Sequence, residues 1–450
     1  MKVEGIAIQI LSQTAYEAWF ENASDEHRRW LKINDFEPDH GSSIVMPGVD
    51  GSIDLVLVCM DPNQPARTIG RVVSRVPEGV YYFCVDDENK VRIHALSLYW
   101  QLAGYSFTRY QSNHMKVDRS LVVDEVVDKS LLHAQVTSIF LVRDLINTPA
   151  HDMTPSDLCD FAEELTKIQQ GQFKRYRGDA LLEQNFPLVH AVGRASIHLP
   201  EIAIGEWGSE GPLIAIIGKG VTFDSGGLNI KPSRYMYPMK KDMGGAAHAI
   251  GLAHLLLQTE VPCRIKLIIP SAENAISGNA FRPSDVLTSR SGKTIEVGDT
   301  DAEGRLLLAD ALSYAAEDQP DLVIDFATLT GAARVAMGPD VPCYFTNDQA
   351  LSDQVFLNSV EHEDQVWELP LIESYRSFLD SSIADIHSTG NEPYGGAIIT
   401  ALFLQTFVDS MPWLHMDLNA VNSRNRDGQP KGGEAQGMLA IYDLILRWMS

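Results

Sequence analysis

Basic side chains are scarce in this 450-residue sequence, which has 36 Lys and Arg residues against 60 Asp and Glu residues and a net charge of -24. A surface this acidic repels phosphate backbones and anionic lipid headgroups. No local cluster of basic residues offsets it, since Arg424 and Arg426 make too short a group. The composition therefore argues against nucleic-acid binding and against attachment to a membrane surface.

Paired cysteines and long apolar runs are also missing. The five cysteines are odd in number and scattered: Cys59, Cys84, Cys159, Cys263 and Cys343. This pattern argues against a disulfide framework and a cysteine-based zinc site, and it fits a reducing compartment. No apolar run reaches the length of a membrane span, and the opening M-K-V-E-G-I-A-I-Q-I has no signal-peptide core. We therefore expect a cytoplasmic protein.

The remaining composition is that of an ordinary globular protein, with 45% hydrophobic and 21% charged residues. A chain of 450 residues favours two domains. We expect residues 1–129 to form a small α/β domain, because strand-like runs (6–10, 55–59, 80–85) are mixed with helical stretches (25–31, 97–102). Residues 130–149 predict a linking helix that ends before Pro149. Residues 150–450 then form the larger domain.

The larger domain shows a regular alternation of buried strands and helices. Four apolar runs have the character of buried parallel strands, and the segments between them have helical periodicity: Leu213 to Ile217, Ile265 to Ile269, Leu322 to Phe326 and Leu414 to Leu418. This alternation predicts an α/β fold with a central, mostly parallel sheet flanked by helices. Ligands of such sheets bind at the carboxyl ends of the strands. The unusual polar residues of the sequence are concentrated there.

One such group is the stretch V-G-D-T-D-A-E-G-R-L-L-L-A-D-A-L, residues 297–312. Thr300 and Glu303 have the spacing of a capping box, in which both side chains satisfy backbone donors at the start of a helix. That interpretation is the commoner one for this pattern. The stretch alone does not decide between a cap and a binding site.

Two further stretches carry charged residues beside glycines. G-K-G-V-T-F-D-S-G-G-L-N-I-K contains Lys219, Asp224 and Lys231, but it lacks the G-x-x-x-x-G-K-[ST] spacing of a nucleotide loop, and its acid opposes phosphate. M-K-K-D-M-G-G-A-A places Asp242 at the start of a helix, where it also fits an N-cap above small packing residues. Each stretch by itself has a structural explanation.

Together the stretches place four carboxylates at strand or helix ends of one sheet: Asp224, Asp242, Asp301 and Glu303. Four negative charges in one pocket force protonation unless cations compensate them. Two divalent cations, about 3.5 to 4 Å apart, are a common hydrolytic device that generates hydroxide near neutral pH. Oxygen ligands suit Mn²⁺ and Mg²⁺ as well as Zn²⁺, so the ligand types leave the metal open.

At this point the sequence closely resembles the leucyl aminopeptidase family, the two-metal cytosolic aminopeptidases of peptidase family M17. The resemblance rests on G-K-G-V-T-F-D-S-G-G-L-N-I-K-P-S, M-K-K-D-M-G-G-A-A and T-D-A-E-G-R-L-L-L-A-D-A-L. The segments S-G-K-T-I-E-V, A-T-L-T-G-A and W-L-H-M-D-L-N-A-V support it. It covers the chain from about Asn147 to the end, with the motifs in the family's order.

The resemblance implies a role for each matching residue. Lys219 and Asp242 correspond to ligands of one metal and Asp301 to a ligand of the other, and Asp224 and Glu303 are shared. Deprotonating Lys219 for this role at pH 7 costs on the order of 4 to 5 kcal/mol. The catalytic side chains correspond to Lys231, which polarises the scissile carbonyl, and Arg305, which holds a bicarbonate ion. The substrate-binding positions are Met239, Thr328, the backbone at Leu329, and Gly331.

The implied activity is a metal-dependent aminopeptidase with two Mn²⁺ or Zn²⁺ ions per subunit. A hydroxide held by both metals attacks the first peptide bond of a substrate whose free α-amine binds a metal. An apolar pocket distinguishes one methylene by only about 1 to 3 kcal/mol, so broad specificity with a preference for Leu or Met is expected. The family forms hexamers, and the resemblance implies a homohexamer here. The alternative is a DNA-binding or scaffold member of the family with little peptidase activity.

The third motif departs from the family, which usually has Asn-Thr-Asp where this chain has Asp299-Thr300-Asp301. The added negative charge lies near Arg305 and puts its bicarbonate role in doubt. Four histidines lie near the motifs. His248 and His254 are interpreted as packed or surface-polar, His415 as structural, and His387 is left without a role.

Overall fold

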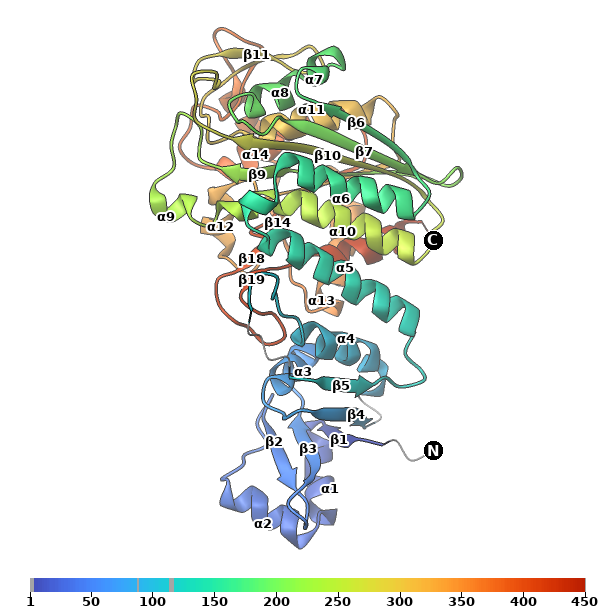
Figure 1. Ribbon diagram of the computed structural model, residues 1–450. Coiled ribbons are helices and arrows are strands. Elements are labelled where there is room, and N and C mark those ends of the chain that lie inside the picture. The colour runs from blue at the N-terminus through green and yellow to red at the C-terminus, as the bar shows by residue number, and fades with distance from the viewer. Residues whose placement is uncertain (1–3, 87–88, 113–116, 450) are drawn as a thin grey trace. The chain divides into compact units, whose positions relative to one another are not determined.

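The computed structural model describes residues 4–86, 89–112 and 117–449, which form two compact units. The first unit lies within residues 1–140 and includes residues 424–431, and the second lies within residues 141–423 and 432–450. Each unit has an α/β fold (Figure 1). None of the helices in the described ranges combines the length and apolar character of a membrane crossing.

The first unit is built on a five-stranded sheet. Its elements are β1 (Ile6–Leu11), α1 (Gln13–Asn22), α2 (Asp25–Ile33), β2 (Ser43–Pro47), β3 (Ile53–Cys59), α3 (Pro65–Val73), β4 (Gly79–Val85), η1 (Lys90–Arg92), α4 (Ile93–Ala103) and β5 (Arg119–Val122). The strand order is β2-β3-β1-β4-β5, and only β2 runs antiparallel to its neighbour. In the central strand, Ile8 and Ile10 are fully buried on one face, as the two-residue period requires.

These elements confirm every strand and helix expected in the first unit. The expected linking helix is also present as α5 (Lys129–Asn147), which contains residues of both units. The first unit further includes residues 424–431, where Asp427 forms an ion pair with Arg71 at 2.5 Å. The domain boundaries at residues 129 and 150 remain a prediction.

The second unit contains a nine-stranded mixed sheet and two small sheets. Its strands are β6 (Gln172–Arg177), β7 (Glu201–Trp207), β8 (Leu213–Gly218), β9 (Gly220–Asp224), β10 (Arg264–Asn274), β11 (Val286–Thr288), β12 (Thr294–Glu296), β13 (Leu322–Ala327), β14 (Cys343–Thr346), β15 (Trp367–Glu368), β16 (Ile386–His387), β17 (Trp413–Asp417), β18 (Val421–Asn422) and β19 (Gly432–Gly433). The main sheet has the order β15-β14-β17-β13-β8-β10-β7-β6, and β9 pairs with β10.

The helices of the second unit cover both faces of this sheet. They are η2 (Ala150–Asp152), α6 (Pro155–Ile168), α7 (Ala180–Glu183), α8 (Pro187–Gly193), α9 (Ser233–Met236), η3 (Met239–Met243), α10 (Gly244–Gln258), α11 (Gly304–Ala316), α12 (Gly331–Met337), α13 (Gln349–Glu361), η4 (Glu373–Leu379), α14 (Gly396–Gln405) and α15 (Met438–Trp448). Figure 1 shows α8 and α11 on one face and α6 and α10 on the other.

The centre of the sheet is parallel, as expected. Strands β17, β13, β8 and β10 run in one direction, whereas β14, β7 and β6 run antiparallel to their inner neighbours. The four expected apolar runs lie in these central strands. Their carboxyl ends meet at one edge, which brings together the polar residues that follow β8, β9, β10, β13 and β17.

Close packing at the start of α10 explains its small residues. A Cβ atom added at Gly245 would lie 2.1 Å from the carbonyl oxygen of Phe326 in β13. One added at Gly218, at the end of β8, would lie 2.5 Å from the Cα atom of Ala246. The glycines therefore allow the first turn of α10 to approach the strand ends where the charged motifs lie.

Candidate metal centre and active site

Three of the four predicted carboxylates converge in the second unit. Asp224 ends β9, Asp242 lies in η3, and Glu303 directly precedes α11. One oxygen of each lies within 4.8 Å of the others, and all three side chains are buried. The end of β9 and the segments just before α10 and α11 thus bring together acids that are up to 79 residues apart (303 minus 224).

The structure contradicts the capping interpretation of these acids. Helix α11 begins at Gly304, and Glu303 caps it without a side-chain hydrogen bond. Thr300 instead donates its hydroxyl to the carbonyl of Gly226 (2.7 Å) and accepts the backbone N–H of Asn229 (2.8 Å). Asp242 is not an N-cap either, because α10 begins after Met243. The capping prediction is wrong because the loop that follows β9 takes the threonine hydroxyl.

Lys219 lies among the converging carboxylates. Its Nζ is 2.7 Å from Asp242 Oδ2 and 3.0 Å from Glu303 Oε1, and it donates to the carbonyl of Thr328 (3.0 Å). Burial acts to lower the pKa of Lys219, but the attraction of Asp242 and Glu303 outweighs it, so the pKa is raised. Lys219 is therefore a cation in this arrangement, and ligation by its amine requires that a metal ion replace a proton.

Lys231 connects the fourth predicted carboxylate to the cluster. Its Nζ lies 2.8 Å from Asp224 Oδ2 and 2.6 Å from Asp301 Oδ1. The turn that carries it needs glycine, since a Cβ atom at Gly226 (φ +88°) would lie 2.8 Å from the same Asp301 oxygen. All five predicted ligands and Lys231 thus form one connected group of four carboxylates and two lysines.

The buried acids have more negative charge than these two lysines compensate. Burial and the neighbouring Asp224 raise the pKa of Glu303, and burial with Asp242 raises the pKa of Asp224 to about 6. Glu303 Oε2 is buried without a hydrogen-bond partner in the described part of the chain, and Glu303 Oε1 and Asp242 Oδ2 meet Lys219 outside hydrogen-bond geometry. Buried carboxylate oxygens with unused lone pairs fit divalent cations.

The predicted substrate-binding residues differ in their surroundings. Thr328 is buried, and its hydroxyl donates to Asp242 Oδ1 (2.9 Å), so its side chain supports a carboxylate of the cluster. Met239 is buried at the start of η3. Leu329 is half-buried and Gly331 is exposed at the start of α12. Leu329 and Gly331 thus lie closer to solvent than Thr328 and Met239.

Arg305 and Asp299 are each held by a backbone contact. Arg305 donates from Nη1 to the carbonyl of Ser388 (2.7 Å), while its Nε is buried and unpaired within the described ranges. Burial lowers the pKa of Arg305 to about 10. Asp299 Oδ1 accepts the backbone N–H of Asp301 (2.9 Å). The side-chain oxygen of the family's usual asparagine can accept the same bond, so the local turn does not require the extra charge.

The histidines behave as structural groups where the sequence predicts it. His248 is buried, with Nδ1 2.6 Å from the carbonyl of Gly244 and Nε2 accepting the N–H of Gln436 (2.8 Å). His415 is buried beside Asp325, with Nδ1 2.6 Å from Oδ1. His254 is half-buried. His387 accepts the backbone N–H of Gly390 through Nδ1 (3.0 Å), which orients its ring.

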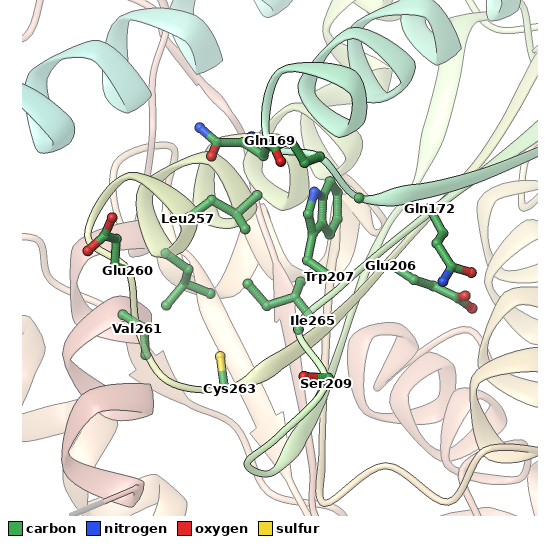
Figure 2. Close-up of a pocket in the computed structure, with 14 residues that line it drawn as sticks. Gln169, Gln172, Glu206, Trp207, Ser209, Leu257, Glu260, Val261, Cys263 and Ile265 are labelled. Atoms are coloured by element: carbon green, nitrogen blue, oxygen red, sulfur yellow. The ribbon is translucent and has the colours of Figure 1, made fainter.

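Two buried residues that the sequence did not single out contact predicted site residues or their loop. Asn274, which ends β10, donates to Asp224, and Asp417, which ends β17, accepts the N–H groups of Leu329 and Thr330. Their position at strand ends is the only sequence signal, and many polar residues share it. A separate cavity of about 580 Å³ near Trp207 and the C-terminal end of α10 is lined by none of the predicted site residues (Figure 2).

Comparison with known proteins agrees with this geometry. Residues 140–442 match the family described as the cytosol aminopeptidase family, catalytic domain. Residues 6–123 match the M17 aminopeptidase N-terminal domain. The two matches together cover both units.

Similar sequences and structures carry related names. A probable cytosol aminopeptidase of Roseiflexus castenholzii is 37% identical over 366 residues, which is 77% of this chain and 75% of that protein. Peptidase B of Klebsiella pneumoniae is 40% identical over 329 residues, 70% of this chain and 77% of that one. The crystal structure of a cytosol aminopeptidase from Coxiella burnetii superposes with a TM-score of 0.95 at 37% identity, covering 100% of this chain and 98% of that chain.

A bottromycin maturation enzyme solved in complex with Mn is similar at a TM-score of 0.88 and 29% identity, covering 99% of each chain. The family matches cover residues 6–123 and 140–442, and the solved structure from Coxiella burnetii covers the whole chain. The chain therefore belongs to the cytosol aminopeptidase family, M17, and is an aminopeptidase of the hydrolase class.

Proposed function

We propose that this aminopeptidase holds two divalent cations through Lys219, Asp224, Asp242, Asp301 and Glu303. The main support is the convergence of three buried carboxylates within 4.8 Å, with Glu303 Oε2 unpaired in the part of the chain that is described. The Mn complex of the similar maturation enzyme favours Mn²⁺, and the oxygen-rich ligand set suits it. Zn²⁺ is the alternative cation.

Cations held by these residues would supply Lewis-acid chemistry: they would ligate the substrate's free α-amine, polarise its first peptide bond and provide hydroxide from water near neutral pH. Lys231 stays protonated, since its ion pairs with Asp224 and Asp301 raise its pKa against the effect of burial. A protonated Lys231 stabilises negative charge that develops on the scissile carbonyl oxygen. Arg305 is positioned by Ser388, and its unpaired Nε is suited to hold bicarbonate.

We further propose peptides with a free N-terminus as substrates and a broad preference for Leu or Met at the first position. An acylated nitrogen cannot ligate a cation, so a free amine is required. Met239, Thr328 and Gly331 would border the pocket for the first side chain, and the backbone at Leu329 would receive the substrate. A homohexamer and a cytoplasmic location remain predictions, the latter in line with the relatives' name. A DNA-binding or scaffold role is not favoured by these relatives.

The test is to remove metal from the full chain with a chelator, restore Mn²⁺ or Zn²⁺, and follow leucine release from a Leu-initiated peptide. The N-acetylated form of the same peptide is the matched control. We expect metal-dependent cleavage of the free peptide alone, because only its amine can bind a cation. Cleavage of both peptides would contradict amine recognition, and cleavage of neither with any metal would support the scaffold alternative.

A further inference from the structure

Asn274 lies beside the candidate metal centre but is not one of its predicted ligands. It is the last residue of β10, directly opposite Asp224 in the parallel pairing with β9, and only 1% of its surface is exposed. Its backbone carbonyl accepts both the N–H (3.1 Å) and the hydroxyl (2.7 Å) of Ser225. These contacts fix the backbone of Asn274 against the residue that follows Asp224.

The side-chain amide of Asn274 joins two of the charged motifs. Its Nδ2 donates to Asp224 Oδ1 (2.8 Å) and to the carbonyl of Thr300 (3.0 Å), the residue before Asp301. Its Oδ1 is buried without a hydrogen-bond partner in the described ranges. Reversing the amide would place an oxygen against two acceptors, so the partners determine which atom is the donor.

The two oxygens of Asp224 consequently have different surroundings. Oδ1 accepts both the N–H of Gly226 (2.8 Å) and the amide of Asn274, whereas Oδ2 lies 2.8 Å from Lys231 Nζ. Two donors on Oδ1 hold the carboxylate in one orientation. Oδ2 therefore has fewer hydrogen-bond donors than Oδ1, and it is the oxygen that faces Lys231.

Glycine makes room for this arrangement. A Cβ atom at Gly227 (φ +61°) would lie 2.9 Å from Asn274 Oδ1 and 3.0 Å from Thr300 Oγ1. The loop after β9, the end of β10 and the third motif thus meet at the Asn274 amide.

We propose that Asn274 is a positioning residue of the metal centre. It presents Asp224 Oδ2 to the cations and fixes the spacing between Asp224 and the loop of Asp301. Groups that hydrogen-bond to metal ligands orient them, and their loss lowers metal affinity by about 10- to 100-fold. This inference rests on the proposed two-cation site.

The experiment compares Asn274→Ala with Asn358→Ala in the metal-free full chain, titrated with Mn²⁺ in a calorimeter. Asn358 is the matched control because it is also fully buried, donates Nδ2 to a backbone carbonyl, that of Ala440, and has an unpaired Oδ1. We expect the Mn²⁺ dissociation constant to rise about 10- to 100-fold for Asn274→Ala and to stay unchanged for Asn358→Ala. Both melting temperatures should fall.

An unchanged Mn²⁺ affinity in Asn274→Ala would overturn the inference and leave Asn274 with a purely structural role. Asn274→Ser, which keeps one donor, is measured as well, and its affinity should lie between those of the alanine variant and the unsubstituted chain. It also replaces Asn274→Ala if that variant does not fold. Failure of the unsubstituted chain to bind Mn²⁺ would instead reject the proposed metal centre, so the two failures are distinguishable.

Discussion

Both ring nitrogens of His248 have fixed partners in the interior of the second unit. Nδ1 faces the carbonyl of Gly244 and must carry a proton, while Nε2 accepts the N–H of Gln436 and must not. Burial lowers the pKa of His248 to about 4, below its ordinary value of 6.5. The neutral form is therefore part of the folded structure, and protonation would leave two donors opposed in a buried space.

A stability loss in mild acid follows from His248. The unfolded chain takes up a proton near pH 6.5 and the folded chain only near pH 4, so this contribution to stability is present above pH 6.5 and is lost as the pH falls to 4. The shift corresponds to about 3 kcal/mol. The test is urea unfolding of the metal-free protein at pH 7, 6, 5 and 4. Between pH 7 and pH 4, the free energy of unfolding of His248→Asn should fall by about 3 kcal/mol less than that of the unsubstituted chain. Parallel stability curves for the two proteins would refute the assignment.

At the level of residues, the sequence predicted most of the candidate site but not its support. Asp224, Asp242 and Glu303 were identifiable because their motifs are long and follow strand or helix boundaries. Asn274 and Asp417 were not, since each acts through a hydrogen bond to a segment at least 50 residues away. Such partners become visible only when the strand order is known.

The loop between β13 and α12 is held from two sides. Thr328 contacts the charged group, as its hydroxyl donates to Asp242 and its carbonyl accepts from Lys219. The next residues are held by Asp417, which accepts the N–H groups of Leu329 (3.0 Å) and Thr330 (3.1 Å) and the hydroxyl of Thr330 (2.7 Å). This loop contains the predicted substrate-binding backbone, and its position relative to the carboxylates depends on both contacts.

Loosening the second contact should affect substrate binding more than turnover. In Asp417→Asn the Thr330 hydroxyl loses a charged acceptor, and a hydrogen bond of that kind contributes about 1.5 to 3 kcal/mol. We expect KM for a Leu-initiated peptide to rise about 10- to 100-fold, with kcat and Mn²⁺ affinity nearly unchanged. Steady-state kinetics provide the measurement.

Thr330→Ser and Thr330→Val form the matched control pair for this loop. The serine keeps the hydroxyl that reaches Asp417 and caps α12 through Ala333, so its KM should stay close to that of the unsubstituted chain. Thr330→Val removes this hydroxyl, so its KM should rise as in Asp417→Asn. A lower melting temperature without any change in KM would mean that the loop contributes stability alone.

Element boundaries near the site were harder to predict than the elements themselves. The apolar runs of β8, β10, β13 and β17 identified the strands because burial on both faces leaves little choice of residue. The start of α11 differed because Thr300 bonds to the loop at Gly226 and Asn229 and not to its own helix. A capping pattern depends only on two residue types three positions apart. It gives no information about a hydrogen-bond partner in another loop that competes for the threonine hydroxyl.

For the whole molecule, the buried carboxylates are a source of instability that cations should relieve. Burial and mutual repulsion raise the pKa values of Asp224 and Glu303, so their ionised forms oppose folding near neutral pH. A cation that binds only the folded chain stabilises it by about 2.7 kcal/mol at 100 times its dissociation constant. Calorimetry should therefore show a higher melting temperature with Mn²⁺ than with chelator.

The matched variant for this prediction is Glu303→Gln, which keeps the shape of the side chain and removes one buried charge. It should melt at a higher temperature than the unsubstituted chain in chelator and gain less from Mn²⁺. An equal gain in both proteins would place the stabilising cation elsewhere.

The domain organisation was predictable only in outline. Two α/β units were expected from length and from the change in strand pattern, and the described structure contains them. The grouping of residues 424–431 with the first unit had no sequence signal, because it depends on contacts such as the ion pair of Arg71 with Asp427 across 356 positions. Two residues so far apart in the sequence leave no local sequence pattern that predicts their contact.

The order of strands in the main sheet has a consequence for the timing of events during synthesis. The predicted ligands span residues 219 to 303, but β13 and β17, on one side of β8, are made only later, and Asp417 follows Glu303 by 114 positions (417 minus 303). A growing chain thus has all its predicted ligands before it has Phe326 and Thr328, at the end of β13, which contact Lys219 and Asp242. Cation binding should therefore be a late step of folding. An incomplete chain that is released early should not bind the cations.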